Sequence, residues 1–202
     1  MRLHNGSTLT ALFALALASS GAAYAQTQDS NFYYQRGLAN VNGDQAQAFA
    51  DFNEAIRLDP RNANAYVGRG SVRHDGGSTA DYTEAIRLDP DNWEAYVRRA
   101  FLYGLQQNYA AALADYDQAI RIRPDHAETW GQRAGTHWDL GNREQAFRDA
   151  DESIRLDPRD ARAWFDRGLF HRRSGNTALA EADFARALRL DPSLRHYYER
   201  MR

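Results

Sequence analysis

The sequence contains no cysteine and no lysine among its 202 residues. The absence of cysteine excludes disulfide bonds, thiolate metal sites and cysteine nucleophiles. The 25 Lys and Arg residues are therefore all arginine, and together with 27 Asp and Glu they give a formal net charge of −2. Because this balance is close to neutral, no overall electrostatic field draws the protein to nucleic acid or to an anionic lipid surface.

Long hydrophobic runs are also absent. The most apolar stretch, residues 9–18 (LTALFALALA), is about half as long as a membrane-spanning helix. It follows Arg2 and precedes the small-x-small sequence Ala23-Tyr24-Ala25, which is the order of a secretory signal. We therefore expect a signal peptide over residues 1–25, cleaved after Ala25, and a short linker over 26–28. The mature chain is then periplasmic or secreted and not inserted in the membrane. A core or interfacial helix over residues 9–18 is the alternative.

Proline is scarce, and its five copies are regularly spaced. Successive prolines are 30, 34, 34 and 34 residues apart, at Pro60, Pro90, Pro124, Pro158 and Pro192. Each ends a similar hexapeptide, such as AIRLDP at residues 55–60 and AIRIRP at residues 119–124. One catalytic site needs one set of groups, so five copies indicate an architectural repeat.

Each repeat contains the same small set of landmarks. An aromatic residue stands six positions after each proline and a small residue ten positions after the first four, while other small residues precede each proline by five and twelve positions. Glycine stands seventeen positions after three of the prolines, and Gln107 replaces it after Pro90. Aromatic and small residues four apart share a helix face, glycine ends a helix, and Asp-Pro stops the next one. The pattern predicts pairs of helices that must stack to bury their apolar faces.

This pattern resembles the tetratricopeptide repeat over residues 29–192. The resemblance implies an all-α, right-handed superhelical solenoid of five antiparallel helix pairs, whose first helices line a concave groove. The expected repeats are 29–60, 61–90, 91–124, 125–158 and 159–192. Residues 193–202 are predicted to form a short C-terminal capping helix, because Leu194, Tyr197, Tyr198 and Met201 follow an amphipathic spacing.

Two repeats depart from the pattern. The first places its landmarks one residue closer together, and the second is four residues short in the segment before Pro90. We expect the second helix of that repeat to lack about one turn. Ser78 and Asp81 have the spacing of a capping box for this shortened helix.

Charged residues also recur in register. An aspartate lies nine positions before every proline, and an arginine lies nine positions after four of them, with Arg36 equivalent in the first repeat. A row of carboxylates suits cations, but each arginine can satisfy one carboxylate through two parallel hydrogen bonds. We therefore predict structural pairs between Asp51, Asp81, Asp115, Asp149 and Asp183 and Arg36, Arg69, Arg99, Arg133 and Arg167.

No motif in the sequence supports catalysis. The histidines lack metalloprotease spacing, and His137 and His171 occupy equivalent places in successive repeats, which favours packing over a metal pair. No serine lies in a nucleophile-elbow context. The sequence predicts no enzyme, no cofactor and no metal site.

The groove is the candidate binding site. Transferred to matching positions, the resemblance assigns partner binding to an apolar and aromatic set with arginines at one rim: Tyr34, Leu38, Val67, Val97, Phe101, Trp138, Phe165, Leu169, Arg172 and Arg173. The other interpretation is that several of these residues pack between repeats. Gly131 and Gly135 either leave a notch beside Trp138 or allow a neighbouring helix to approach closely.

The sequence thus predicts an exported, non-enzymatic protein–protein interaction module that holds a peptide segment or a partner domain. Members of the resembled family that clamp chaperone carboxylates use lysine and asparagine in the groove. Because this chain places Val, Phe, Gly and Leu there, that role is disfavoured. The alternative function is that of a structural subunit, permanently packed in a bacterial envelope or secretion complex.

Overall fold

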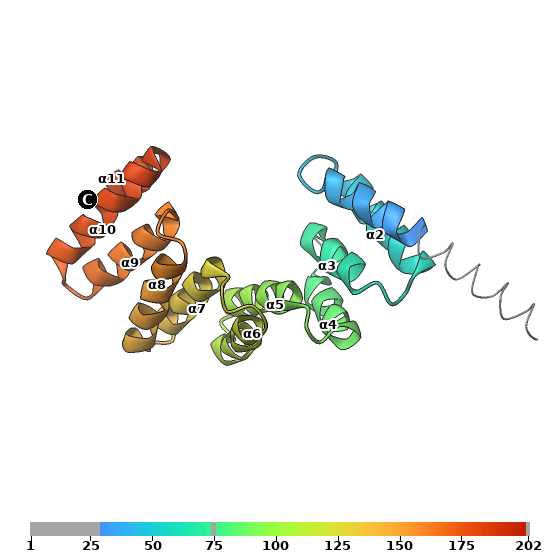
Figure 1. Ribbon diagram of the computed structural model, residues 1–202, viewed down its shortest axis with the longest axis horizontal. Coiled ribbons are helices and arrows are strands. Elements are labelled where there is room, and N and C mark those ends of the chain that lie inside the picture. Colours follow the sequence, from blue (N-terminus) through green and yellow to red (C-terminus); the bar gives the residue numbers. More distant parts are fainter. Residues whose placement is uncertain (1–28, 74–75, 201–202) are drawn as a thin grey trace, which may run out of the picture. The chain divides into compact units, whose positions relative to one another are not determined.

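The computed structural model describes residues 29–73 and 76–200 (Figure 1). Within these ranges the regular structure is entirely helical. The chain divides between Pro90 and Asp91 into two compact units. The predicted signal peptide and Met201 of the C-terminal stripe lie outside the described residues.

The helices follow one another as antiparallel pairs. The first unit contains a helix over residues 29–40, then α2 (Gln45–Leu58), α3 (Ala63–Val72) and α4 (Ser78–Leu88). The second contains α5 (Trp93–Leu105), α6 (Tyr109–Ile122), α7 (Ala127–Asp139), α8 (Arg143–Leu156), α9 (Ala161–Arg173) and α10 (Thr177–Leu190), followed by the 3-10 turn η1 (Pro192–Leu194) and α11 (Arg195–Arg200). Pairs such as α7 and α8 pack side by side (Figure 1). The predicted all-α repeat fold with a short C-terminal helix is confirmed.

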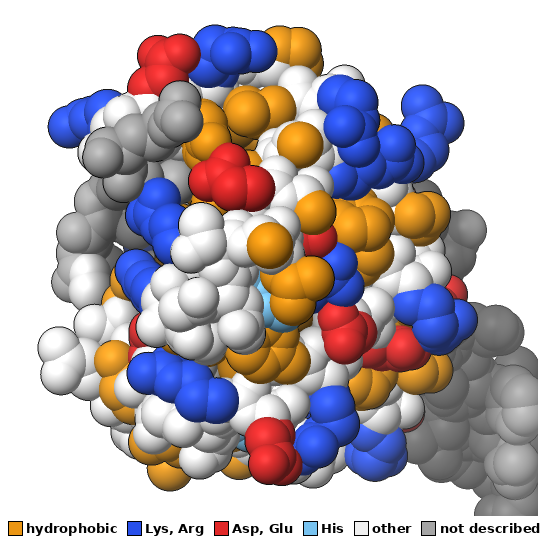
Figure 2. All heavy atoms as spheres, turned by 90° about the vertical axis from the view of Figure 1, so that its left-hand side faces the viewer, with side chains coloured by type: hydrophobic (Ala, Val, Ile, Leu, Met, Phe, Trp, Pro, Cys, Tyr) orange, Lys and Arg blue, Asp and Glu red, His pale blue; other side chains and the backbone are white. Residues whose placement is uncertain are grey.

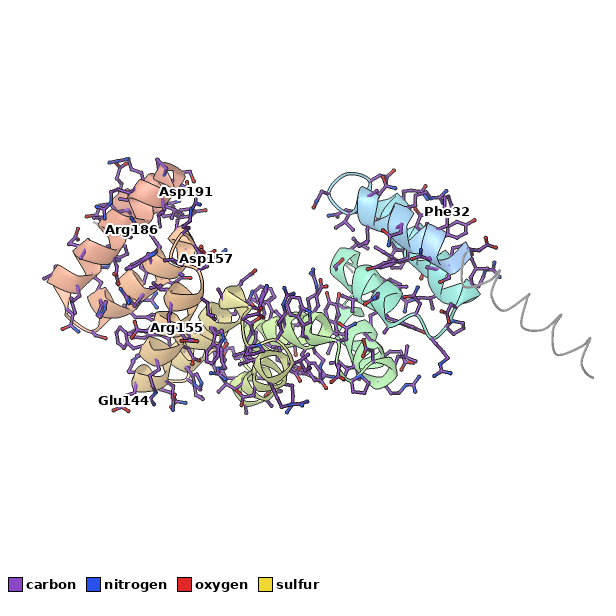
Figure 3. All side chains as sticks on the ribbon, viewed as in Figure 1. Phe32, Glu144, Arg155, Asp157, Arg186 and Asp191 are labelled. Atoms are coloured by element: carbon purple, nitrogen blue, oxygen red, sulfur yellow. The ribbon has the colours of Figure 1, made fainter. Side chains whose placement is uncertain are left out.

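The recurring hexapeptide is the end of each second helix and the start of the turn that follows. In its first copy, Ala55 is fully buried. The backbone N–H of Asp59 donates a hydrogen bond of 2.9 Å to the carbonyl oxygen of Ala55. The Asp59 carboxylate in turn accepts a 3.0 Å hydrogen bond from the N–H of Arg61, after the proline. Asp157 and Asp191, labelled in Figure 3, bind the N–H groups of Arg159 and Ser193 in the same way, each at 2.9 Å. The aspartate thus holds the turn into the next segment.

The aromatic residue six positions after the proline closes the same turn. The indole N–H of Trp130 donates to the carbonyl oxygen of Pro124 at 2.9 Å, and that of Trp164 donates to Pro158 at 3.1 Å. The spacing between proline and aromatic residue is therefore fixed by a hydrogen bond across the turn.

The C-terminal segment packs on the last helix pair. Tyr198 lies with its ring centroid 5.4 Å from that of Phe184, and with Leu194 it covers the cluster that contains Phe165 and Phe184. This confirms the cap for Leu194 and Tyr198. Tyr197, which the stripe also included, is 53% exposed instead, and its ring lies tilted against that of His196, because α11 has only six residues and presents a narrow face.

The shortened repeat is confirmed, but its predicted cap is not. Helix α4 has 11 residues where α6 has 14, a difference of about one turn. The capping box is wrong: Gly77 is the N-cap, and α4 has no side-chain cap hydrogen bond. Arg69 and Arg73 donate to the Asp81 carboxylate, which therefore serves helix packing instead.

Candidate protein-interaction surface

Three first helices, α5, α7 and α9, follow one another along the second unit (Figure 1). Helix α7 contacts both α5 and α9. Phe101, Gly135 and Leu169 stand 34 residues apart, so they occupy equivalent positions on the three helices. We call the surface around these positions the α5–α7–α9 face.

The α5 part of this face exposes large apolar side chains. Phe101 is 51% exposed and Leu105, one helical turn further on, is 68% exposed. Leu169 on α9 is half-buried against the cluster around Phe184. Adjacent exposed apolar side chains are typical of interaction sites, whereas scattered single ones are ordinary.

The two α7 glycines differ in their surroundings. A Cβ atom on Gly131 would lie 3.2 Å from Ser153 Oγ, so this glycine permits close contact with α8. A Cβ atom on Gly135 would meet nothing within 4 Å. The sequence left a notch and a close helix contact as alternatives; the structure shows the close contact at Gly131 and open space at Gly135.

Four of the ten predicted binding residues are buried in the cores. Their exposed fractions are 6% for Val67, 9% for Val97, 5% for Trp138 and 8% for Phe165. Trp138 stacks on Phe170 at a centroid distance of 4.5 Å and an interplanar angle of 5°. A continuous aromatic surface of Phe101, Trp138 and Phe165 is therefore not formed.

The other six predicted residues remain at least partly accessible. In the first unit, Tyr34 is half-buried beside Phe52, with ring centroids 6.1 Å apart, and Leu38 is 43% exposed. In the second unit, Phe101 and Arg173 are exposed, while Leu169 and Arg172 are half-buried. The partner-binding role of all ten residues stays a prediction.

A polar row that the sequence reasoning missed crosses the same face. Arg98, Gln132 and Asp166 are again 34 residues apart. Gln132 donates through Nε2 to Glu128 Oε1 at 2.9 Å, while its buried Oε1 has no hydrogen-bond partner. Burial raises the pKa of Asp166 to about 6, against the opposing effect of Arg162. The regular spacing of these three polar residues in the sequence could have predicted the row.

Charge is unevenly distributed over this face. Helix α7 carries Glu128 and Asp139, whereas α9 ends in Arg172 and Arg173. Glu94 pairs with Arg98 on α5, and Arg162 lies beside Asp166 on α9, so these charges offset one another. The Arg172 guanidinium lies 5.7 Å from the centre of the Phe184 ring. Figure 2, which faces the C-terminal helices, shows arginines and acidic side chains interspersed with hydrophobic ones at this end of the molecule.

The predicted aspartate–arginine pairs are all present. Arginine Nε donates to the aspartate carboxylate at 2.9 Å in the first pair, 3.1 Å in the second, 2.8 Å in the third, 2.7 Å in the fourth and 2.8 Å in the fifth. The hydrogen bonds from Arg36 hold the pKa of Asp51 below its usual value. The carboxylates are thus occupied by structural ion pairs.

Three of these arginines also bond to the preceding repeat, which the sequence reasoning missed: Arg69 Nη1 donates to Asn53 Oδ1 at 2.9 Å, and the other two form ion pairs. Arg133 Nη1 donates to Asp117 at 2.6 Å, and Arg167 Nη1 donates to Asp151 at 2.7 Å. Asp117 and Asp151 each lie two positions after an aspartate of the five pairs, which together with their arginines we call the aspartate–arginine ladder. This recurring spacing in the sequence could have predicted the additional ion pairs. Stacked repeats therefore share ion pairs as well as apolar contacts.

His137 and His171 lie beside the same carboxylates. Their Nε2 atoms are each 3.9 Å from an aspartate oxygen, of Asp149 and Asp183 respectively. Burial lowers the pKa of His137. In the part of the chain that the structure describes, no group of three or more His, Asp or Glu residues is arranged to hold a metal ion. Over the same residues, no helix combines the length and apolar character of a membrane span.

Stacked antiparallel helix pairs with shared landmarks define a helical-repeat protein. Sequence models of the tetratricopeptide repeat match residues 93–126 and 132–194. Over these residues the chain consists of tetratricopeptide repeats. A search of curated protein sequences finds no significant match.

Solved structures share the fold. The crystal structure of MamA is 20% identical with a TM-score of 0.66 and covers 84% of this chain and 96% of its own. MamA from Desulfovibrio magneticus RS-1, from residue 41 to its end, is 15% identical with a TM-score of 0.70, over 82% of this chain and 96% of its own. YrrB is described as a tetratricopeptide repeat protein with an unusual peptide-binding site. It is 20% identical with a TM-score of 0.64, over 89% of this chain and 92% of its own. At these identities the likeness shows the fold.

Proposed function

We propose that this protein is an exported, non-enzymatic interaction module that binds a peptide segment or a partner domain on the α5–α7–α9 face. The observation that carries the proposal is the exposed pair Phe101 and Leu105, at 51% and 68%, on the helix next to the open space over Gly135. Apolar side chains at the centre of an interface supply much of its binding energy. The peptide-binding site named for YrrB, which has the same fold, supports the choice of ligand.

The ion pairs support a non-enzymatic role. General acid–base chemistry needs a carboxylate or imidazole within reach of a reacting group. The carboxylates that recur in register are instead bound by arginines, for example Asp149 by Arg133 at 2.7 Å. Their placement favours rigidity of the repeat over chemistry.

Export rests on the signal-like order of residues 1–25 in the sequence. N-terminal sequencing of the protein isolated from its native compartment should find Gln26 as the first residue. A cytoplasmic product that begins at Met1 would overturn the proposed export and leave the binding proposal standing.

Binding is tested with the partner recovered by affinity pull-down from envelope extract and identified by mass spectrometry. Phe101→Ala should leave the fold intact, because the side chain is 51% exposed. It should weaken binding about thirty-fold, the equivalent of about 2 kcal/mol for an interface anchor. Isothermal titration calorimetry measures the change.

Arg121→Glu is the control, because Arg121 is exposed on the second helix α6, outside the α5–α7–α9 face. It should leave the affinity unchanged. Undiminished binding by Phe101→Ala, with a partner that co-purifies and cannot be dissociated, would favour the alternative function, a structural subunit of an envelope or secretion complex.

A further inference from the structure

We propose that the α5–α7–α9 face recognises a segment in which one bulky apolar residue is followed, about three positions later, by an acidic residue. This inference rests on the proposed function and names the chemistry of the partner. The apolar side chain occupies the open space over Gly135, and the acidic side chain pairs with Arg172 and Arg173 of α9.

The position of the apolar side chain follows from Gly135, for which no contact within the protein accounts. Glycine is, apart from proline, the least favourable residue in a helix interior. The contact with Ser153 Oγ accounts for Gly131, but nothing within 4 Å of a Cβ atom accounts for Gly135. Helices α5 and α9 flank this position with Phe101 and Leu169, so an apolar side chain placed there gains apolar neighbours on both sides.

A polar group close to the glycine selects a hydrogen-bond donor. Gln132 lies three residues before Gly135, and its Nε2 donates to Glu128 Oε1 at 2.9 Å. An ionised carboxylate only accepts hydrogen bonds, so this contact fixes which end of the Gln132 amide faces Glu128. The buried Oε1 is left without a donor. A rotation of the half-buried Gln132 side chain brings this atom to the surface, where a main-chain N–H of the bound segment supplies the donor, since buried acceptors in folded proteins are paired.

The acidic position follows from charge and distance. Helix α9 ends in Arg172 and Arg173, whereas α7 carries Glu128 and ends in Asp139; further back on α9, Arg162 Nε lies 3.9 Å from Asp166 Oδ2, so these two charges offset each other. Acidic residues are thus attracted to α9 and repelled at α7, which gives the segment one preferred direction. Packed helices lie about 8–10 Å apart. An extended chain advances about 3.3 Å per residue, so about three residues cross from α7 to α9.

The test selects random dodecamer peptides displayed on phage against the mature chain, residues 26–202. The expected consensus is an apolar residue, two variable positions and Asp or Glu. A synthetic peptide with this consensus should bind the parent protein. It should bind the Gly135→Arg variant at least tenfold more weakly. Arg173→Glu should weaken the binding of the acidic peptide. It should strengthen the binding of the same peptide with Lys in place of the acidic residue.

The matched control is Ala114→Arg, which adds the same side chain at an exposed position of α6 and should leave the affinity unchanged. Gly135→Ala verifies the fold: because its Cβ meets nothing within 4 Å, the melting temperature should not fall. Circular dichroism on Gly135→Arg should show the parent helix content, since arginine favours helix over glycine.

Selected peptides that lack the consensus, or that bind Gly135→Arg as tightly as the parent, would overturn this inference. The proposed function would survive that result if Phe101→Ala still weakens the binding of the partner recovered from envelope extract. A selection that yields no binding peptide would also overturn the inference, and the Phe101→Ala measurement then decides the proposed function separately.

Discussion

Equivalent residues in successive repeats show which backbone positions tolerate a side chain. Gln107, in the turn from α5 to α6, has a φ of 60°, and Gly141 and Gly175 have φ values of 87° and 81° at the equivalent turns. The left-handed conformation costs a residue with a Cβ atom roughly 1–2 kcal/mol. The repeat pattern therefore enforces the turn even where its preferred glycine is missing.

This comparison predicts opposite effects of two substitutions. Gly141→Ala should lower the free energy of unfolding by about 1 kcal/mol, because a Cβ atom there meets nothing within 4 Å and only the backbone conformation opposes it. Gln107→Gly should be neutral or stabilising, because the relief of strain offsets the greater freedom of glycine in the unfolded chain. Urea denaturation monitored by circular dichroism measures both. A stabilising Gly141→Ala would contradict the expectation.

The aspartate–arginine ladder predicts a larger effect at one buried carboxylate. Asp115 has a side chain that is 9% exposed, and Arg99 binds it through two nitrogens, each at 2.8 Å. Asp115→Ala should cost about 1–3 kcal/mol of unfolding free energy, because it removes the carboxylate that Arg99 binds through two hydrogen bonds inside the packed repeat. Thermal and urea denaturation measure the loss.

Glu152→Ala is the matched control for the ladder. It removes the carboxylate that pairs with Arg155, whose side chain is 66% exposed, on the surface of α8. The melting temperature should hardly change, because solvent screens exposed pairs. An unchanged melting temperature for Asp115→Ala, together with the loss of a bound cation, would assign the carboxylates to a cation site.

Among the elements, α11 and η1 have the most specific role. Together they cover Phe184 and Phe165 with Tyr198 and Leu194. A terminal repeat needs a solvated outer face, because its apolar surface has no further repeat to pack on. This segment therefore ends the apolar stacking of the second unit.

Deletion of residues 193–202 should lower the melting temperature and promote association that grows with protein concentration. Analytical ultracentrifugation and thermal denaturation measure these two effects. Tyr197→Ala is the control within the same helix, because Tyr197 is 53% exposed and its loss should leave stability unchanged. A deletion variant as stable and as monomeric as the parent would show that Tyr198 and Leu194 do not serve as a cap.

For the whole molecule, the division into two units has a consequence for stability. The buried clusters around Tyr116, Trp138 and Phe184 each consist of residues of the second unit. In a repeat array, stability is approximately the sum of the repeats and their neighbouring interfaces. The second unit therefore contains the contacts that it needs to fold.

A fragment of residues 91–202 should be helical and melt cooperatively, as circular dichroism can establish. A fragment without a thermal transition would show that the second unit depends on the first.

The sequence by itself determined the repeat. Helix pairs, turns and the five ion pairs all follow from spacings within one repeat, and such local relations recur whenever the spacing recurs. The tertiary structure alone decided which predicted binding residues are exposed. Trp138 and Gly104 occupy equivalent positions, yet Trp138 is buried because Phe170 of the following repeat stacks on it, and a Cβ atom on Gly104 would meet nothing within 4 Å. Exposure on the α5–α7–α9 face depends on the volume of side chains from the neighbouring helices, which the spacing of one repeat does not encode.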